Sequence, residues 1–436
     1  MVSSVYFAAK TDLQWDSDLK PLQPKLIPTS VYKNLCLLSV IFAFSVGLTI
    51  GILIPLIYLK GSDNNRTELL IKPTANPNLI RTVFLNNSYA FRNDSKQYSS
   101  VSFIDGVKKG YELIEDGIFW GKQIENSLPE GYKDKKHGIW EDYVKNAVAI
   151  KMENGCGRMQ NRLITFQDGL KGCVRYRQNT DQIQGELFSF YLAKILNLPN
   201  LAPSTVSVVD LKQPLWQNLR NEIAAAQWNS NRPIVLTQFI TNLKSSNIPN
   251  VFKPIERHLN KFDVINMTKN ELLDKNDMNK MLVELAQWSD LIIFDYLTAN
   301  LDRIVNNLYN YQWNVNIMDA PAHNLARKSD SDLLVFLDNE SGLLHGYRLL
   351  KKYEIYHSIL LENLCIFRRP TADKIKKLRN DKNIGFLLRG MFEKLNSDSV
   401  KDILPTLPDK SVKILNERIE KVHNQILKFL KPLIFW

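Results

Sequence analysis

The chain has 436 residues, of which 44% are hydrophobic and 23% are charged. This ordinary globular balance excludes a disordered or fibrous protein. The formal net charge of +11 would favour a nucleic-acid partner in a cytosolic protein, but the first long apolar segment weakens that interpretation.

Residues 35–59 contain no charged side chain. As a helix, this segment spans about 37 Å at roughly 1.5 Å per residue, which exceeds the ~30 Å hydrocarbon core of a bilayer. A cleaved signal peptide has a shorter apolar core, of roughly 7–15 residues. The segment therefore predicts a single transmembrane signal anchor, preceded by a cytosolic tail over residues 1–34.

The flanking lysines and arginines give only a weak indication of orientation. N-glycosylation motifs decide it better, because all of the predicted acceptors follow the anchor: Asn65, Asn86, Asn93 and Asn266. Residues 60–100 are rich in Asn, Ser, Thr and Lys and are typical of a flexible stem. We therefore expect a type II protein with its large C-terminal part in the secretory lumen.

The four cysteines agree with an oxidising compartment. Cys36 lies in the anchor, whereas Cys156 and Cys173 flank a predicted hairpin and are the candidates for a disulfide. Closing a loop of that length stabilises a protein by about 3 kcal/mol in the chain-entropy model. Cys365 has no evident partner, and we expect it to be a buried free thiol.

The predicted secondary structure of the lumenal part changes along its length, from mainly strands in residues 101–248 to mainly helices in residues 249–436. This order predicts an α+β fold. Asp168-Gly169 is a hairpin signal between two strands. The predicted strands are residues 162–167, 173–177, 203–210, 233–240 and 333–337. The predicted helices are residues 185–196, 280–298, 353–367, 372–378 and 412–430.

The stretch from Trp288 to Arg303 joins an apolar helix to a loop that carries Asp302. Asn307 follows five residues later, as in the Asp-x-x-x-x-Asn of a kinase catalytic loop. An aspartate on such a loop can accept the proton of an attacking hydroxyl group. The alternative is that Asp302 and Arg303 form a structural ion pair.

Asp338 ends the buried strand 333–337 and is followed by a glycine turn at Gly342. A carboxylate in this position is suited to hold a divalent metal ion, although Asp338-Asn339 taken alone is also typical of an ordinary turn. Together with Glu186 on the upstream helix, the order of these acidic residues favours phosphoryl transfer.

Several runs resemble the four-jointed family of Golgi kinases, and its insect members above all. The similarity covers roughly residues 101–436, and it is carried by Cys156–Arg162, Gln184–Glu186, Phe294–Arg303, Ala320–Arg327, Val335–Tyr347 and Leu407–Lys413.

The resemblance implies a divergent two-lobed protein-kinase-like fold and a type II Golgi membrane protein, with possible release of the domain by stem cleavage. It implies ATP with Mg²⁺ or Mn²⁺, phosphorylation of Ser or Thr in the cadherin repeats of Fat and Dachsous type protocadherins, and a role in planar cell polarity and growth control. By the same resemblance, Asp302 is the catalytic aspartate and Asp338 a metal ligand. Glu186 is the acidic residue of the small-lobe helix, and Asn307 binds phosphate and metal.

The sequence departs from ordinary kinases in its phosphate-binding parts. Arg175 stands where those enzymes keep a lysine, and Lys171 is a rival for the role. Only Gly155-Cys-Gly157 stands in place of a G-x-G-x-x-G loop. Residues 312–332 are expected to be an insertion between the two active-site loops. Asn339-Glu-Ser341 is formally a glycosylation motif, but a glycan there would block the metal.

Two other functions remain open. Asp330-Ser-Asp332 matches the Asp-x-Asp motif with which many type II Golgi glycosyltransferases hold a nucleotide-sugar, although it lies in a polar run that we interpret as solvated. The missing lysine would also suit a kinase-shaped binding protein without activity. Turnover of ATP, turnover of a UDP-sugar, or binding without turnover separates the three.

Overall fold

A computed structural model of the chain describes residues 113–253, 259–269 and 274–430. The predicted tail (1–34), anchor (35–59) and stem (60–100) lie outside these residues, as do the predicted glycan acceptors Asn65, Asn86 and Asn93. Within the three described ranges, no helix is long and apolar enough to cross a membrane.

The first half of the described chain is rich in strands. Its elements are β1 (Ile114–Glu115), β2 (Phe119–Trp120), α5 (Lys122–Ser127), α6 (Asp134–Asn146), β3 (Ala149–Asn154), β4 (Arg162–Phe166), β5 (Lys171–Tyr176), α7 (Thr180–Leu196), β6 (Ser204–Val208), α8 (Arg220–Ala225), β7 (Pro233–Gln238) and β8 (Leu243–Asn247).

The second half is mainly helical, so the predicted α+β class is confirmed. Its elements are η3 (Asn250–Phe252), α9 (Lys261–Thr268), α10 (Lys275–Thr298), α11 (Ile304–Asn310), η4 (Val315–Asp319), β9 (Pro321–Lys328), β10 (Leu334–Phe336), α12 (Leu344–Glu362), α13 (Arg369–Asp381), α14 (Ile384–Leu395), α15 (Asp398–Lys401) and α16 (Asp409–Leu430).

A five-stranded antiparallel sheet forms the centre of the strand-rich half, in the order β3-β4-β5-β7-β6. Side chains alternate between its two faces, as the pleat of a strand requires. Val174 and Tyr176 of β5 belong to a core cluster on one face, together with Trp140 of α6. Val235 of β7 faces the other way, into the larger core that contains α7.

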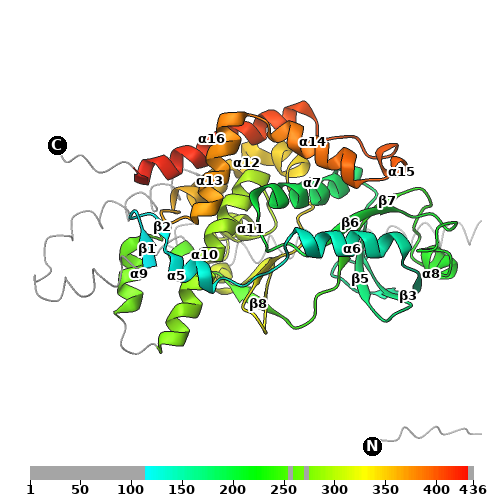
Figure 1. The fold of residues 1–436 in the computed structure, drawn as a ribbon, viewed down its shortest axis with the longest axis horizontal. Helices are drawn as coiled ribbons and strands as arrows, with labels where there is room; N and C mark the ends of the chain where they lie inside the picture. Colours follow the sequence, from blue (N-terminus) through cyan, green and yellow to red (C-terminus); the bar gives the residue numbers. More distant parts are fainter. Residues whose placement is uncertain (1–112, 254–258, 270–273, 431–436) are drawn as a thin grey trace, which may run out of the picture. The chain divides into compact units, whose positions relative to one another are not determined.

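Helix α7 joins the sheet to the helical half, because it contacts β7 on one side and α12 and α14 on the other. Its sequence explains this position. The side chain of Asn179 caps its first turn, Asn197 ends it in the left-handed conformation, and residues 183–193 are buried all round. A helix without a polar face is expected at the centre of a domain. Figure 1 shows α7 between the strands and the C-terminal helices.

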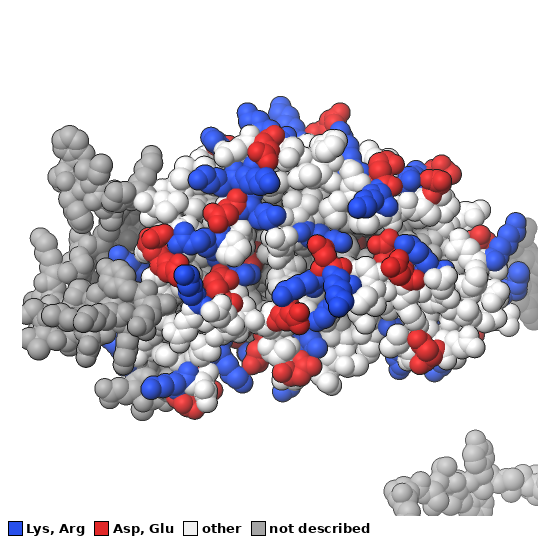
Figure 2. Space-filling view, viewed as in Figure 1, with Lys and Arg blue, Asp and Glu red and all other residues white. Residues whose placement is uncertain are grey.

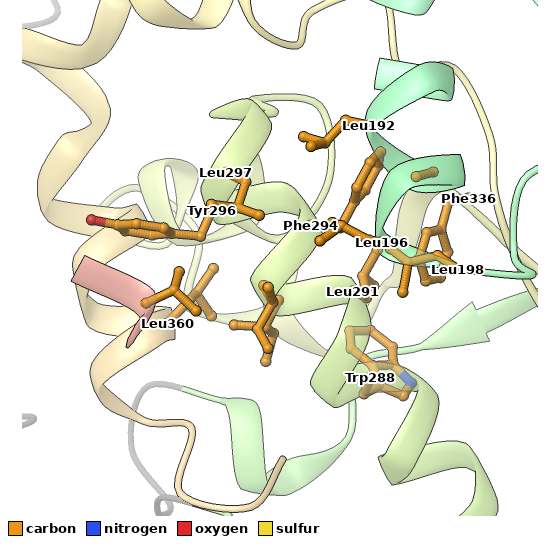
Figure 3. Packing of buried hydrophobic residues seen from close by; sticks show 14 of the residues in the cluster. Leu192, Leu196, Leu198, Trp288, Leu291, Phe294, Tyr296, Leu297, Phe336 and Leu360 are labelled. Atoms are coloured by element: carbon orange, nitrogen blue, oxygen red, sulfur yellow. The ribbon is translucent and has the colours of Figure 1, made fainter. Parts of the chain in front are cut away.

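The larger core is built around α10. Trp288, Leu291 and Phe294 recur at three-residue spacing along one side of this helix and belong to this core. Figure 3 shows Leu291 and Phe294 near Leu196 of α7. The ring of Phe294 stacks on that of Phe336 in β10, with 5.9 Å between the ring centroids. This contact fixes the strand that leads to Asp338 against the helix that leads to Asp302.

The segment between the two predicted active-site loops, residues 312–332, contains regular secondary structure. It forms η4 and then β9, which is the central strand of a second antiparallel sheet in the order β10-β9-β8. The polar sequence of β8 (Leu-Lys-Ser-Ser-Asn) gave no strand signal. Segment 312–332 therefore helps to position β10.

Several predicted boundaries are wrong. The helix predicted at 185–196 begins at Thr180, because Asn179 is its N-cap. The helix predicted at 353–367 covers residues 344–362 instead, since the backbone of Phe367 bonds to Ile118 and Trp120. The polar strand β3 and the helices α6 and α14 were not predicted.

The predicted disulfide between Cys156 and Cys173 is present, with 5.7 Å between the two Cα atoms. It ties the loop between β3 and β4 (residues 155–161) to strand β5. Cys365 is a buried free thiol, as predicted, and burial raises its pKa to about 12.

We expect Cys156→Ser and Cys173→Ser to destabilise the protein to similar degrees, by about 3 kcal/mol, because either change opens the same bridge. The double variant should then be no less stable than either single variant. Urea unfolding midpoints, compared with and without a reducing agent, measure these losses. Additive losses in the double variant would contradict a shared bridge.

Candidate active site

The alternation of β5 places Arg175 at the centre of the candidate site. Because Val174 and Tyr176 face the core cluster on one side of the sheet, the side chain between them faces the opposite side, toward α7. Arg175 Nε lies 3.6 Å from Glu186 Oε2 on that helix. Lys171 is exposed at the start of the same strand, so of the two candidate cations it is Arg175 that reaches Glu186.

Arg175 also reaches the segment that follows β10. One of its terminal nitrogens lies 2.6 Å from Asp338 Oδ1 and 3.0 Å from Glu340 Oε2. Burial lowers the pKa of the guanidinium, but the surrounding carboxylates raise it above the ordinary value. Burial raises the pKa of Glu186, Arg175 lowers it, and Asp338 and Glu340 raise it further. The cluster thus joins two predicted site carboxylates through one cation.

Glu340 is a site residue that the sequence reasoning missed. Its carboxylate is 1% exposed and accepts hydrogen bonds from Arg175 and, at 2.7 Å, from Arg177 Nε. Gln182 of α7 adds a bond of 3.3 Å, and Arg158 approaches to 2.7 Å. The only signal was the position of Glu340, two residues after Asp338 in the run that carries the family resemblance.

The backbone of residues 338–342 is held against α7. The N–H of Asn339 donates to Glu186 Oε2 at 2.6 Å. At Gly185 a Cβ atom would lie 2.5 Å from the carbonyl oxygen of Glu340, so no larger residue fits there without a shift. Asp338 has φ = 51°, a left-handed conformation that Asp and Asn tolerate better than most residues.

Arg303 does not pair with Asp302, which excludes the structural ion pair considered from the sequence. Its side chain is 0% exposed and turns inward, where it bonds to Asp295 and to the side-chain oxygen of Asn339. It also donates to the carbonyl of Leu337 at 3.1 Å. Arg303 therefore connects the end of α10 to the Asp338 segment.

Asp302 lies near the end of the loop between α10 and α11. Its N–H donates to Asn300 Oδ1 at 2.9 Å, and its carboxylate lies 3.9 Å from Arg158. Burial raises the pKa of Asp302, and the charge of Asp338 raises it further. Arg158 and the hydroxyl of Ser341 lower it. A partly desolvated carboxylate near a second acidic segment is suited to accept a proton.

Asn307 lies in α11 and is 1% exposed. Its amide nitrogen donates to the carbonyl of Ile317 at 2.9 Å. Its buried oxygen has no hydrogen-bond partner among residues 113–253, 259–269 and 274–430. No hydrogen bond within this part of the chain joins the side chain of Asn307 to Arg175, Asp338 or Glu340.

The donor chemistry fits a hard divalent cation. The carboxylate of Asp338 and the unpaired amide oxygen of Asn307 are ligands that Mg²⁺ and Mn²⁺ prefer. Within the described ranges, no group of three or more His, Cys, Asp or Glu residues is arranged to hold a metal alone. A metal here would therefore take part of its ligands from a substrate, as is usual for Mg²⁺ with nucleotide phosphates.

The remaining predicted residues, those of the Asp-x-Asp and glycosylation motifs, do not contribute to this candidate metal site. Asp330 is exposed in the turn between β9 and β10, 3.1 Å from Lys328, and Asp332 pairs with Lys280 at 3.3 Å. This Asp-x-Asp motif is thus engaged by surface lysines. Asn339 is 2% exposed and hydrogen-bonded, which leaves no room for a glycan. Asn266 is exposed on α9, and its glycosylation stays a prediction.

The surface charge of the face drawn in Figure 2 gives no further indication of a ligand. On the face in Figure 2, lysine and arginine side chains alternate with aspartate and glutamate. No single-sign field of the kind that attracts nucleic acid dominates this face.

The chain matches the family model described as the four-jointed box protein middle domain over residues 135–430. It is 51% identical to the Drosophila melanogaster protein named extracellular serine/threonine protein kinase four-jointed, over 72% of this chain and 61% of that protein. The chain thus spans less than two thirds of the length of that relative. It is 33% identical to the human four-jointed box protein 1, over 72% of this chain and 70% of that protein.

The chain is also similar to solved structures, among them a crystal structure of the Golgi casein kinase. Its sequence is 12% identical to this chain. The match covers 77% of this chain and 91% of the kinase chain, with a TM-score of 0.46. A second structure of that kinase with Mn and ADP bound covers 84% and 93%, with a TM-score of 0.44.

Proposed function

The chain belongs to the four-jointed box protein family, and from this premise we propose that its C-terminal domain is a serine/threonine protein kinase of the secretory pathway. One observation carries the proposal. Arg175 of the sheet pairs with Glu186 of α7 and with Asp338 after β10, while Asp302 lies on the adjoining loop. A cation, a metal-binding carboxylate and a proton acceptor are the parts that phosphoryl transfer from ATP requires.

In this mechanism each residue has a separate role. Asp302 accepts the proton of the acceptor Ser or Thr hydroxyl as the oxygen attacks the γ-phosphorus. Glu186 fixes the orientation of Arg175, whose guanidinium binds the phosphates. Asp338 and Asn307 would hold Mg²⁺ or Mn²⁺, which supplies charge neutralisation at the phosphate oxygens when bound.

Family membership supports the finer parts of the proposal. We place the two-lobed kinase-like domain in the Golgi lumen, behind the type II anchor at residues 35–59. The proposed acceptors are cadherin repeats of Fat and Dachsous type protocadherins, which gives the protein a role in planar cell polarity and growth control. Release of the domain by cleavage of the stem at 60–100 belongs to the same proposal.

Transfer of radiolabelled γ-phosphate from ATP tests the activity. The full-length chain, purified in detergent, is incubated with a cadherin-repeat protein and either Mg²⁺ or Mn²⁺, and with UDP-sugars in parallel. Label on Ser or Thr is the expected result. Sugar transfer would instead favour the glycosyltransferase, and acceptor binding without any turnover would favour a binding protein.

Topology provides an independent test. Since the acceptor motifs follow the anchor, we expect an N-glycan-removing enzyme to increase the gel mobility of the expressed protein. Protease added to intact microsomes should spare the region after residue 60, and detergent should abolish that protection. Digestion of this region without detergent would exclude the lumenal orientation.

The pKa of Asp302 predicts how the rate depends on pH. Burial raises this pKa, and only the ionised carboxylate accepts a proton. The rate should therefore fall, with a one-proton dependence, as the pH drops through a value above the ordinary aspartate range. Initial rates at saturating ATP, measured across acidic pH, check this prediction. A rate that stays constant until the pKa range of an exposed aspartate would contradict it.

A further inference from the structure

Phosphoryl transfer places negative charge on the equatorial oxygens of the moving phosphoryl group, and this charge needs a cation beside it. Among the residues that the structure describes, no lysine pairs with Asp302, Asp338 or Glu340. The cations that pair with these carboxylates are Arg158, Arg175 and Arg177. A fourth arginine, Arg303, bonds to the side chain of Asn339 between Asp338 and Glu340.

Three of these arginines are already fixed by the protein. The side chain of Arg175 is 14% exposed and lies among three carboxylates. Arg177 is 2% exposed and is held by Glu340 and by the side-chain oxygen of Asn161. Arg303 is 0% exposed and points away from Asp302. Arg177 and Arg303 therefore stabilise the scaffold and are too buried to follow a substrate.

Arg158 differs from the other three because its side chain is 51% exposed. It extends from the loop between β3 and β4, and one terminal nitrogen lies 2.7 Å from Glu340 Oε1. Its other terminal nitrogen lies 3.9 Å from Asp302 Oδ2. The guanidinium thus bridges the segment that carries the metal-binding carboxylate and the residue that accepts the proton. In the proposed reaction the γ-phosphoryl group moves from the ATP held near Asp338 to the hydroxyl group activated by Asp302, so it passes between these two residues.

We propose that Arg158 is a catalytic residue that contacts the transferred γ-phosphoryl group, as an arginine finger supplied by the same chain. The proposal rests on the kinase function proposed above. When ATP binds, its γ-phosphate oxygens replace Glu340 and Asp302 as partners of the Arg158 fork. Asp302 is then free to accept a proton.

The step balances without another reactant. A bond forms between the acceptor oxygen and the γ-phosphorus, and the bond between that phosphorus and the bridging oxygen breaks. The bond's electron pair leaves on ADP, and the hydroxyl proton passes to Asp302. Two parallel N–H donors on Arg158 suit the phosphoryl oxygens better than a single ammonium group would.

The loop that carries Arg158 is held in place before any substrate arrives. Cys156, two residues earlier, is bonded to Cys173 in the strand that also carries Arg175. The carbonyl of Cys156 accepts a hydrogen bond of 2.7 Å from Asn161 at the end of the loop. A donor positioned in advance loses little free energy to reorganisation during the reaction.

Arg158→Ala tests the proposal in the full-length chain. We expect the phosphorylation rate at saturating ATP to fall about 10³-fold or more, the range known for arginine fingers. In calorimetry with Mn²⁺, ADP should bind unchanged, because it lacks the γ-phosphate, whereas the β,γ-imido analogue of ATP should bind more weakly. Arg158→Lys should recover only part of the rate, since it restores the charge without the fork.

Arg348→Ala is the matched control, because Arg348 is an arginine of similar exposure, 53%, that pairs with the carboxylate of Asp181 on α7 instead of with the site. It should keep the wild-type rate. A wild-type rate for Arg158→Ala, or an equal loss of affinity for ADP and the analogue, would overturn the role of Arg158 alone. If Arg158→Ala does not fold, as judged by thermal unfolding, a full rate for Arg158→Lys would overturn it. Failure of the wild-type chain to bind nucleotide would overturn the kinase function itself.

Discussion

Replacing Asp338 by Asn is expected to abolish phosphoryl transfer and to weaken the binding of ATP with its metal, while the protein still folds. Asn fits the left-handed backbone at this position (φ = 51°) as well as Asp does. The carboxylate charge that would hold the metal is lost. Arg175 keeps Glu186 and Glu340 as partners, so the cluster retains most of its ion pairs.

Replacing Asp302 by Asn should reduce turnover by about 10²- to 10⁴-fold, the usual effect of removing a general base. Asp302 forms no hydrogen bond or ion pair with Arg175 or Glu186 of the described structure, so binding of ATP with its metal should remain. The two variants are therefore nearly inactive for different reasons, and calorimetry with ATP and Mn²⁺ separates them. Equal nucleotide affinities in the two variants would contradict the assigned roles.

Asp330→Asn makes the same chemical change in the exposed turn between β9 and β10. Because Asp330 pairs only with Lys328 and Ser331 in the described part of the chain, this control should keep full kinase activity. Loss of activity in Asp330→Asn, together with normal activity in the Asp302 and Asp338 variants, would revive the glycosyltransferase hypothesis.

The parts of the site that could be predicted from sequence are those with local signals. Asp168-Gly169 identified the hairpin, and alternation along β5 decides which way Arg175 faces. The apolar runs before Asp302 and Asp338 identified the helix and the strand that present them. Each of these signals depends on residues within one turn or one strand, where backbone geometry restricts the outcome.

The remaining parts depend on contacts between distant segments. Glu340 binds Arg177 across 163 positions of the sequence, and Arg158 reaches Asp302 from a loop of the other half of the domain. An ion pair between Arg303 and its neighbour Asp302 was the alternative that the sequence left open, but the place of Arg303 inside the fold directs it to Asp295. Burial of a charge favours whichever partner the tertiary structure supplies, and local sequence does not show which one that is.

Glu340→Gln tests whether the missed residue holds the cluster together. The carboxylate of Glu340 is 1% exposed, and it is the acid that pairs with Arg177, which is itself 2% exposed. Glutamine keeps the size and one acceptor oxygen but leaves the buried guanidinium without a counter-charge. Removing one partner of a buried ion pair typically costs about 3–5 kcal/mol. We therefore expect a large fall in the urea midpoint with an unchanged slope.

Glu420→Gln is the control for this change, because Glu420 accepts two hydrogen bonds from Arg379 at the surface, where both side chains are 42% exposed. Water and salt screen such a pair, so its loss should barely move the midpoint. Raising the salt concentration should further reduce the effect of Glu420→Gln. It should leave the effect of Glu340→Gln nearly unchanged, since the ion pair between Glu340 and Arg177 is shielded from solvent. Equal midpoints for the two variants would show that Arg177 finds a substitute partner. Glu340 would then be one of several partners of the arginines, and not the residue that holds them together.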